Sequence, residues 1–400
     1  MTDSPHDHVV RVGTLDDARA VLRSRTMRQA LYDEGAVVMA DCLLDLHGTE
    51  HRDRRCLENR LFRRETFEFY EEDLLPSAIV DAMAPMMERG RGDLIPIGYR
   101  TVMHLTALIA GVDVFEGGDD ALEMVVKQFA RGATAVHATG DRATLKREVD
   151  DAMNVFDELF LRPSIDRRAA LIRAVDQEGA SVELLPRDVL TTLLRNVDRL
   201  ELPDDVIRRE VAFYLQAGGH STANALTHTL DELWSCGDSN LVERAATDRR
   251  FLQRCVHESL RLHPASPVAW RRALSDCELP SGQTAREGSL VVVDLEAVNR
   301  DPAVWGDDAA AFVPGRPPPA TLNPWGLSFG SGMHACIGME LDGGVLSEDS
   351  TTTELYGTVT LLAAALLEAG AAPDPDRAPE VDPESERLHY STYPIVFDRP

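Results

Sequence analysis

The residues with the clearest chemical meaning lie in a glycine-rich segment near the C-terminal end of the chain. Residues 329–338 have the form FGxGxHxCxG and contain His334 and Cys336. Three glycines allow the backbone a tight path and a close approach to a flat ligand. A cysteine held there just before a helix is expected to have a lowered pKa and to exist as thiolate, the form that ligates iron. A buried thiol without a chemical role would not account for the phenylalanine, the glycines and the histidine at these spacings.

A carboxylate and a guanidinium form a second pattern earlier in the chain. Glu258 and Arg261 have i, i+3 spacing, which places them on one face of a predicted helix over 247–262. Alone, such a pair is typical of a solvated helix surface. The surrounding sequence HESLRLH is similar to a zinc-protease helix, but His257 and His263 diverge by about 240° around a helix. We therefore expect no zinc site there.

A polar interruption lies inside the predicted helix over 204–235. Residues 217–224 read AGGHSTAN, with two adjacent glycines followed by His220, Ser221 and Thr222. Each glycine in a helix interior costs roughly 1 kcal/mol relative to alanine, so the segment either ends the helix or serves a purpose. A hydroxyl can both donate and accept a hydrogen bond, and a histidine titrates near neutrality. These side chains are therefore candidates for moving protons.

Together these segments resemble the cytochrome P450 family of haem-thiolate monooxygenases, and the resemblance extends over about residues 10–400. It implies haem b as the cofactor and Cys336 as the thiolate ligand of its iron, a ligand that favours O–O cleavage. Phe329 and Gly338 would frame the ligand loop, and backbone N–H groups around Gly338 would temper the charge on the sulfur.

The resemblance also assigns the residues that would bind the haem propionates. His334 is one of them. His51 and Arg55, which share a helix face at i, i+4 spacing, and Arg271 in the sequence WRRA are the others. Each of them alone would be an ordinary surface charge. Anionic propionates in a partly buried site need several cations, which makes the set coherent.

A structural core is implied as well. Glu258 and Arg261 fit the ExxR motif of the family, and Arg316 in residues 312–316 supplies the second arginine. Two planar donor forks can share one buried carboxylate. The implied role is to shape the loop that carries Cys336, with residues 299–302 fitting the stretch between them.

The sequence departs from the family at the residues that relay protons during oxygen activation. The position usually held by an acid is His220, and the usual threonine is Ser221, followed by Thr222. We expect Ser221 and His220 to handle protons in an altered relay. Alternatively the substrate supplies the hydroxyl, or the enzyme performs an unusual oxidation such as coupling, ring closure or nitration. A histidine turned away from the haem is the simplest structural alternative.

Composition excludes several classes of function. The chain has 400 residues, 27% of them charged, and a formal net charge of −26. Such an acidic surface repels nucleic-acid phosphates and anionic membranes, so neither is an expected partner. The six cysteines form no CxxC pair, and no apolar run is long enough to span a membrane. With no recognisable signal peptide, these features favour a soluble protein in the reducing cytoplasm.

Periodicity predicts a mainly α chain with a small β portion, folded as a single P450 domain over residues 1–400. We expect helices over 14–30 with Thr14 as N-cap, 49–75, most of 76–235, 247–262 and 350–369, and strands over 289–295 and 389–397. His51 lies unusually early, which implies a shortened N-terminal region of the P450 fold. Residues 339–344 also lack the common Leu-Ala-Arg continuation of the family.

Partners and substrate are encoded more weakly. In the family, a helix like the arginine-rich one here lies on the proximal side, where a ferredoxin or flavodoxin docks; its arginines are Arg52, Arg54, Arg55, Arg60, Arg63 and Arg64. The residues expected to line the substrate pocket are Ala217, Gly218, Val268 and Ala269, with residues 27–46 covering it. These small and aliphatic groups suit an apolar or aromatic molecule.

Three hypotheses follow. The first is a bacterial P450 monooxygenase of secondary metabolism that hydroxylates or demethylates a small organic molecule with O2, a ferredoxin or flavodoxin and an NAD(P)H reductase. The second keeps the haem but performs peroxide-driven or other atypical oxidation. The third is a non-catalytic haem sensor, which a retained cysteine loop and a retained hydroxyl in the groove argue against.

Overall fold

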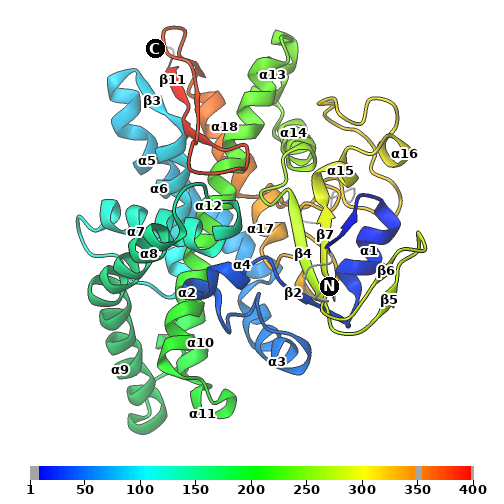
Figure 1. The fold of residues 1–400 in the computed structure, drawn as a ribbon. Coiled ribbons are helices and arrows are strands. Elements are labelled where there is room, and N and C mark those ends of the chain that lie inside the picture. Colours follow the sequence, from blue (N-terminus) through cyan, green and yellow to red (C-terminus); the bar gives the residue numbers. More distant parts are fainter. Residues whose placement is uncertain (1–8, 347–353, 398–400) are drawn as a thin grey trace.

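The computed structural model describes residues 9–346 and 354–397 and is mainly helical, as predicted. One long helix, α12 (Asp204–Ser235), runs through the molecule and is surrounded by other helices (Figure 1). Its neighbours include α6 (Leu94–Ala110), α7 (Asp119–Ala133), α14 (Arg249–Leu262) and α18 (Thr358–Glu368). The predictions for α12 and α14 are confirmed nearly to the residue.

The remaining helices complete the helical body and its connections. They are α1 (Leu15–Arg23), α2 (Ala36–Met39), α3 (Gly48–Glu58), α4 (Arg64–Phe69), α5 (Leu75–Arg89), α8 (Arg142–Phe156), α9 (Arg162–Glu178), α10 (Val189–Leu194), α11 (Val197–Leu200), α13 (Ser239–Thr247), α15 (Leu295–Asn299), α16 (Pro302–Trp305) and α17 (Met339–Gly343). Their buried faces form one large hydrophobic core around α12.

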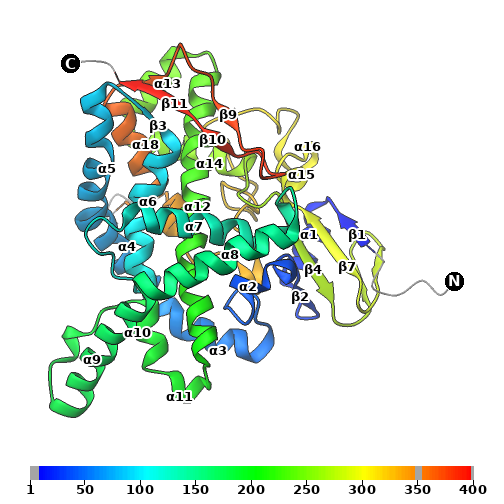
Figure 2. The same cartoon turned by 60° about the vertical axis from the view of Figure 1, so that its left-hand side comes forward.

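A four-stranded sheet lies on one side of this helical body (Figure 2). Its order is β1 (Val9–Val12), β7 (Leu290–Asp294), β4 (Val268–Ala273) and β2 (Met27–Gln29); β1 and β7 are parallel and the other pairs antiparallel. Alternate valines of β1 and β7 pack with α1 in a second, smaller core. The predicted strand over 289–295 is therefore confirmed, and the short N-terminal region before α3 still contributes two strands to the sheet.

Three small antiparallel units complete the β portion. β11 (Pro394–Phe397) pairs with β3 (Arg91–Asp93) and β8 (Ala371–Pro373), β10 (Tyr390–Thr392) pairs with β9 (Glu380–Val381), and β5 (Cys277–Glu278) pairs with β6 (Thr284–Ala285). The strand predicted over 389–397 is thus two strands in different sheets. Tyr393 separates them, because its buried ring turns into the core and its hydroxyl donates to Asp231.

Several predicted helix boundaries were wrong. Thr14 caps α1, with its hydroxyl 3.4 Å from the N–H of Asp17, but the helix ends at Arg23 because β2 is drawn into the sheet. The helix predicted over 49–75 is interrupted at residues 62–63. The helix predicted over 350–369 begins only at Thr358, and residues 350–353 lie outside the described residues.

The adjacent glycines of α12 allow close packing against its neighbours. A Cβ built on Gly218 would lie 2.4 Å from Cγ2 of Thr106 on α6, whereas one on Gly219 would lie 3.3 Å from Cγ1 of Val126 on α7. Thr106 cannot move aside easily, since it is buried and its hydroxyl donates to the carbonyl of Met103 at 3.0 Å. The helix therefore accepts a glycine at 218 in order to approach α6.

Gly218→Ala should be less stable than Gly219→Ala by about 1–3 kcal/mol, because only the first substitution overpacks a buried contact. The two variants are matched, since each gains the same helix propensity of roughly 1 kcal/mol. Urea unfolding of both holoproteins measures the difference. Equal midpoints would contradict the packing explanation.

A buried charge cluster fixes α3 against α12. Arg54 donates to Glu58 at 3.3 Å and also to Glu210, and the hydroxyl of Tyr214 donates to Glu58 at 2.6 Å. Two carboxylates thus share one guanidinium away from water. Burial, followed by repulsion from Glu58, raises the pKa of Glu210 to about 8. This cluster anchors the helix that carries His51 and Arg55.

Glu210→Gln should flatten the pH dependence of stability. Because the folded-state pKa of Glu210 is raised, the folded protein retains a proton that the unfolded chain releases above about pH 4.3. Wild-type unfolding free energy should therefore fall as the pH rises from about 5 to about 8 through this group. Denaturant titrations at several pH values should show a smaller fall for the variant, and parallel curves would refute the assignment.

Candidate functional site

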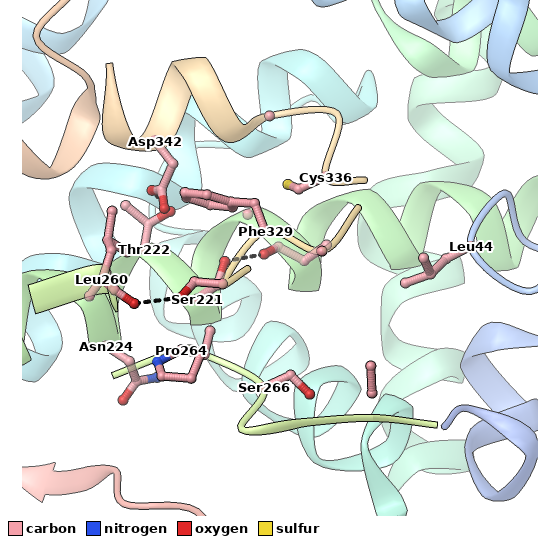
Figure 3. Close-up of a pocket in the computed structure, with 18 of the residues that line it drawn as sticks. Leu44, Ser221, Thr222, Asn224, Leu260, Pro264, Ser266, Phe329, Cys336 and Asp342 are labelled. Carbon is pink, nitrogen blue, oxygen red and sulfur yellow. Dashed lines mark hydrogen bonds between the residues drawn. The ribbon is translucent and has the colours of Figure 1, made fainter. Parts of the chain in front are cut away.

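A large cavity lies between α12, the segment that follows α14, the loop before α17 and residues 29–44. Its volume is about 600 Å³ and its lining is mostly apolar. Figure 3 shows Cys336 on the loop before α17, with Ser221 and Thr222 projecting from α12. The cavity joins segments that are far apart in sequence, which makes it the natural place for a functional site.

Cys336 forms part of the cavity wall. Its backbone N–H donates to the carbonyl of Phe329 at 2.8 Å, which closes the glycine-rich loop. Burial raises the pKa of the thiol to about 11, and a hydrogen bond from the backbone N–H of Gly338 opposes this rise. The prediction of a lowered thiol pKa was therefore wrong for the protein alone, because desolvation outweighs the nearby helix. A bound metal ion would deprotonate a coordinating thiol outright.

Four cationic or basic side chains line another part of the cavity. The ring centroids of His51 and His334 are 4.6 Å apart, Arg55 donates to the carbonyl of Ala335 at 2.8 Å, and Arg271 donates to Gln29. In the part of the chain that the structure describes, no carboxylate forms an ion pair with any of the four. Nε2 of His51 and both ring nitrogens of His334 are buried without a hydrogen-bond partner.

The electrostatics of these four side chains indicate a binding site for an anion. Burial, with repulsion from neighbouring cations, lowers the pKa of His51 to about 4 and that of His334 even further. Burial lowers the pKa of Arg271 to about 10. Buried polar atoms without partners are costly, and so are clustered cations. Two propionate carboxylates would supply the missing acceptors and the missing charge, so the predicted residues fit haem.

The core implied by the ExxR motif is present. Nε and Nη2 of Arg261 both donate to Glu258 at 2.8 Å, and Nε of Arg316 donates to the same carboxylate at 3.1 Å. Arg261 also donates to the carbonyls of Asn299 and Ala309. The side-chain oxygen of Asn299 accepts the N–H of Leu327 at 2.8 Å. The core is thereby tied to the segment that leads into the cysteine loop.

The predicted relay residues do not lie together. Ser221 and Thr222 line the cavity, but His220 does not. The two ring nitrogens of His220 form hydrogen bonds with the hydroxyl of Tyr99 and the side-chain amide of Asn224. Burial lowers the pKa of His220 to about 3. Successive helix residues point about 100° apart, so His220 faces α6 when Ser221 faces the cavity. His220 therefore does not line the cavity itself, and a role for it in proton transfer stays a prediction.

Each of the two hydroxyls on the cavity side of α12 already has a partner. Ser221 donates to the carbonyl of Ala217 at 2.5 Å, one turn earlier. Thr222 donates to Oδ1 of Asp342 at 2.6 Å, and burial raises the pKa of that carboxyl to about 6. Asp342 was missed from sequence. Its only signal was the departure of residues 339–344 from the family pattern.

The residues predicted for the substrate pocket are all found in the cavity wall, namely Ala217, Gly218, Val268 and Ala269. Residues 29–44 contribute Gln29, Leu31, Tyr32, Leu43 and Leu44, consistent with the predicted cover. Two lining residues that the sequence did not reveal are Tyr32 and Arg387.

Residues 386–389 line the cavity and form its roof, and main-chain hydrogen bonds join this part of the chain to the turn between α7 and α8. The turn between α7 and α8 contains His137 and Thr139, and residues 383–387 lie beside it. The N–H of Thr139 donates to the carbonyl of Glu384 at 3.1 Å, and the N–H of Glu386 donates to that of His137 at 2.8 Å. Ala138 and Ser385 form a β-bridge between these bonds.

The arginine-rich segment is not one exposed face. Arg54 is buried in the cluster with Glu210, and Arg55 lines the cavity. Arg52, Arg60 and Arg63 are exposed, and Arg60 and Arg63 lie beyond the end of α3. The basic surface is therefore smaller than the sequence indicated.

Other site classes find no support in residues 9–346 and 354–397. Within them, no helix has the length and apolarity needed to cross a bilayer, and no cluster of potential ligands could hold a metal ion. His257, the candidate considered for zinc, bonds through Nε2 to the carbonyl of Gly343 at 2.7 Å. All six cysteines lie in this described part, and all are free.

Known proteins share both the sequence motifs and the fold. A family model described as Cytochrome P450 matches residues 237–341. Cytochrome P450 monooxygenase 205 of Postia placenta is 27% identical over 233 residues, covering 48% of this chain and 43% of that protein. The chain thus spans less than half the length of this curated relative.

Similar solved structures cover nearly the whole chain. CalO2 has a TM-score of 0.76 at 21% identity, covering 97% of this chain and 90% of its own. P450BioI, in a complex with an acyl carrier protein ligated with hexadec-9Z-enoic acid, has a TM-score of 0.74 at 18% identity, covering 97% and 92%. The sequence match includes Glu258, Arg261, Arg316 and Cys336, and the cavity residues fit the haem that this family binds through a cysteine thiolate. Residues 237–341 therefore match the cytochrome P450 family, and the chain has the cytochrome P450 fold.

Proposed function

We propose that this protein is a haem-thiolate monooxygenase that hydroxylates or demethylates a small organic molecule with O2 and two electrons. The observation that supports this best is the combination, in one cavity, of Cys336 with basic side chains that lack an acidic partner. Cys336 would ligate the iron, and His51, Arg55, Arg271 and His334 would bind the propionates. The lining around Ala217 and Val268 would hold an apolar substrate on the other side.

The haem, when bound, supplies oxygen activation, and thiolate ligation favours O–O cleavage. The chain does the rest through positioning and exclusion of water. The basic side chains orient the cofactor, and the Glu258–Arg261–Arg316 core fixes the approach of the cysteine loop. Ser221 donates a hydrogen bond to the carbonyl of Ala217, so the lone pairs of its oxygen can accept a hydrogen bond from water in the cavity.

We further propose a ferredoxin or flavodoxin with an NAD(P)H reductase as the electron source. The exposed Arg52, Arg60 and Arg63 give an otherwise acidic protein a local basic surface that attracts an acidic partner. Arg52 shares α3 with His51 and Arg55, so this surface lies beside the cofactor site. A cytoplasmic enzyme of bacterial secondary metabolism completes the proposal, since six free cysteines suit a reducing compartment.

The direct test is spectral and catalytic. Purified holoprotein is titrated with small aromatics, terpenoids and amino-acid derivatives while the Soret band is followed for a low-spin to high-spin shift. Compounds that bind are then incubated with NADH, a ferredoxin and its reductase. A saturable shift followed by NADH-dependent product supports the proposal. A protein without a haem-thiolate spectrum, even after haem is supplied, would refute it.

A second candidate, peroxide-driven oxidation with the same haem, is favoured by one specific observation. The acid expected beside the reacting centre is absent from α12, because His220 lies outside the cavity and the proton of Ser221 is already donated to the helix. The usual acid–alcohol pair for delivering protons is therefore missing from α12, and the acid that lines the cavity, Asp342, comes from α17. Comparing product yield with hydrogen peroxide and with the ferredoxin system separates the two candidates.

Ser221→Ala tests whether the remaining hydroxyl takes part in proton delivery. If it does, product formed per NADH consumed should fall roughly tenfold or more, since general acid–base groups typically contribute ~10²–10⁴-fold. Thr229→Ala is the matched control, because the hydroxyl of Thr229 makes the same kind of bond, to the carbonyl of Ala225 one turn earlier at 2.8 Å, but does not line the cavity. Unchanged coupling in Ser221→Ala would eliminate a proton-transfer role and strengthen the peroxide-driven candidate.

A further inference from the structure

Arg387 is a guanidinium in the cavity wall without an acidic partner. It is one of the roof residues, on the segment between β9 and β10. Its Nη1 donates to the carbonyl of Ala265 at 3.1 Å, and its Nη2 donates to the hydroxyl of Thr134 at 3.0 Å and lies 3.4 Å from Nε2 of His220. All three partners are neutral. Nε is buried and has no partner.

The other charges of the cavity have assignments. Arg55 and Arg271 belong to the propionate cluster, and Arg300 pairs with Glu296 at 3.0 Å. Arg387 remains, and in the described part of the chain no carboxylate lies within ion-pair distance of it. Asp382 has an electrostatic effect on Arg387 but is too far away to form an ion pair with it. The neighbouring Glu386 lines the cavity but is exposed to solvent. Burial lowers the pKa of Arg387 to about 10, the direction expected of a cation that lacks a counter-ion.

A second donor faces the same region. Tyr32 lines the cavity, and the positive charges of Arg271 and Arg387 both act on its phenol. No hydrogen bond of its hydroxyl to another described residue is present. Much of the remaining wall is aliphatic or aromatic, including Leu31, Leu44, Val102 and Phe213. Apart from the propionate cluster, the cavity thus combines an apolar body with a polar corner, formed by Arg387 and Tyr32, that donates hydrogen bonds and carries positive charge.

We propose that Arg387, assisted by Tyr32, anchors a carboxylate of the substrate, so that the enzyme oxidises a free organic acid. This rests on the proposed function and specifies its substrate class. A guanidinium offers a planar donor fork that matches a carboxylate, and charge-assisted hydrogen bonds are strongest where water is excluded. The acid group is held at the roof, and the apolar remainder of the molecule extends toward the face opposite Cys336. An acyl chain linked to a carrier protein as a thioester has no free carboxylate and gains nothing from this corner.

The experiment uses holoprotein and two matched pairs of probes, dodecanoate with dodecanamide and 2-naphthylacetate with 2-naphthylacetamide. Dissociation constants come from the Soret shift in wild type, Arg387→Gln, Arg387→Lys and Leu388→Ala. Leu388 also lines the cavity but carries no charge, so its truncation reports general changes of cavity shape. Haem content and the thiolate spectrum of each variant show whether Arg387 supports the cofactor instead.

We expect wild type to bind at least one acid about tenfold or more tightly than its amide. Arg387→Gln should weaken acid binding by a factor of roughly 10–100 and leave amide binding within about threefold, and Arg387→Lys should restore part of the loss. Leu388→Ala should change both members of a pair equally. If Arg387→Gln weakens the binding of acid and amide equally, Arg387 only supports the structure of the cavity and the proposal is wrong. If wild type does not bind acids more tightly than amides, the proposal is also overturned. Loss of the haem-thiolate spectrum from wild type would instead refute the proposed function.

Discussion

Cys336→Ser should abolish the thiolate signature of the reduced, carbon monoxide-bound protein and remove NADH-dependent product formation. Cys336 is the only cysteine of the six that lines the cavity. A serine hydroxyl has a far higher pKa than a thiol and does not ionise to replace the thiolate. The backbone of the loop does not depend on the sulfur, because its closing hydrogen bond joins the N–H of residue 336 to the carbonyl of Phe329. Far-UV circular dichroism should therefore remain that of the folded protein.

The matched control is Cys56→Ser. Cys56 is free and exposed on α3, the helix that also carries His51 and Arg55. The Cys56→Ser variant should retain its haem, its thiolate spectrum and its turnover. If the thiolate spectrum persists in Cys336→Ser, Cys336 is not the iron ligand. The orientation of the haem assigned to this cavity would then also be wrong.

Glu258→Gln should be strongly destabilising. The carboxylate accepts hydrogen bonds from Arg261, Arg316 and the N–H of Val313, and the side chain of Arg261 is fully buried. The amide removes the carboxylate that the two guanidiniums share; Arg316 still pairs with Asp308 at 2.6 Å, but Arg261 is left without an ion pair among the described residues. Breaking a buried ion pair on one side costs about 3–5 kcal/mol, because the remaining charges stay desolvated. Denaturant unfolding of the holoprotein measures this loss.

Asp150→Asn provides the comparison for Glu258→Gln. Asp150 pairs with Lys146 at 2.8 Å on the exposed face of α8. Exposed pairs contribute roughly 0–1 kcal/mol, so this variant should unfold close to wild type. If Glu258→Gln also unfolds close to wild type, the ExxR core does not stabilise the fold in the manner described. Haem content should follow the stability, since the core fixes the segment that leads to Cys336.

The motifs that sequence reasoning located were those whose geometry is local. The cysteine loop, the i, i+3 pair of Glu258 and Arg261, and the shared face of His51 and Arg55 depend on a few neighbouring residues, and the structure brings them to one cavity or one core. The length of α12 was predictable for the same reason, since its apolar period continues through the two glycines.

Errors arose where distant packing decides. His220 occupies the expected position in the motif, but its direction depends on the packing of α12 against α6 and Tyr99. The sequence predicts that Arg54 is a surface charge, but in the structure it is buried against Glu210, which lies far away in the sequence. Arg387 carries no local signal, because its meaning comes from a cavity built by other segments. The pKa of the Cys336 thiol was mispredicted for the same reason, since its desolvation depends on all the segments that form the cavity wall.

The main-chain hydrogen bonds of the roof have a consequence for how this part of the cavity wall can move. The turn between α7 and α8 cannot lift alone, because its bonds with residues 383–387 must break or the β9–β10 hairpin must move with it. Rotation of side chains does not open such a joint. Movement of this part of the wall therefore requires local opening of backbone hydrogen bonds, and the exchange of the amide hydrogens of Thr139 and Glu386 with solvent deuterium reports how often the joint opens.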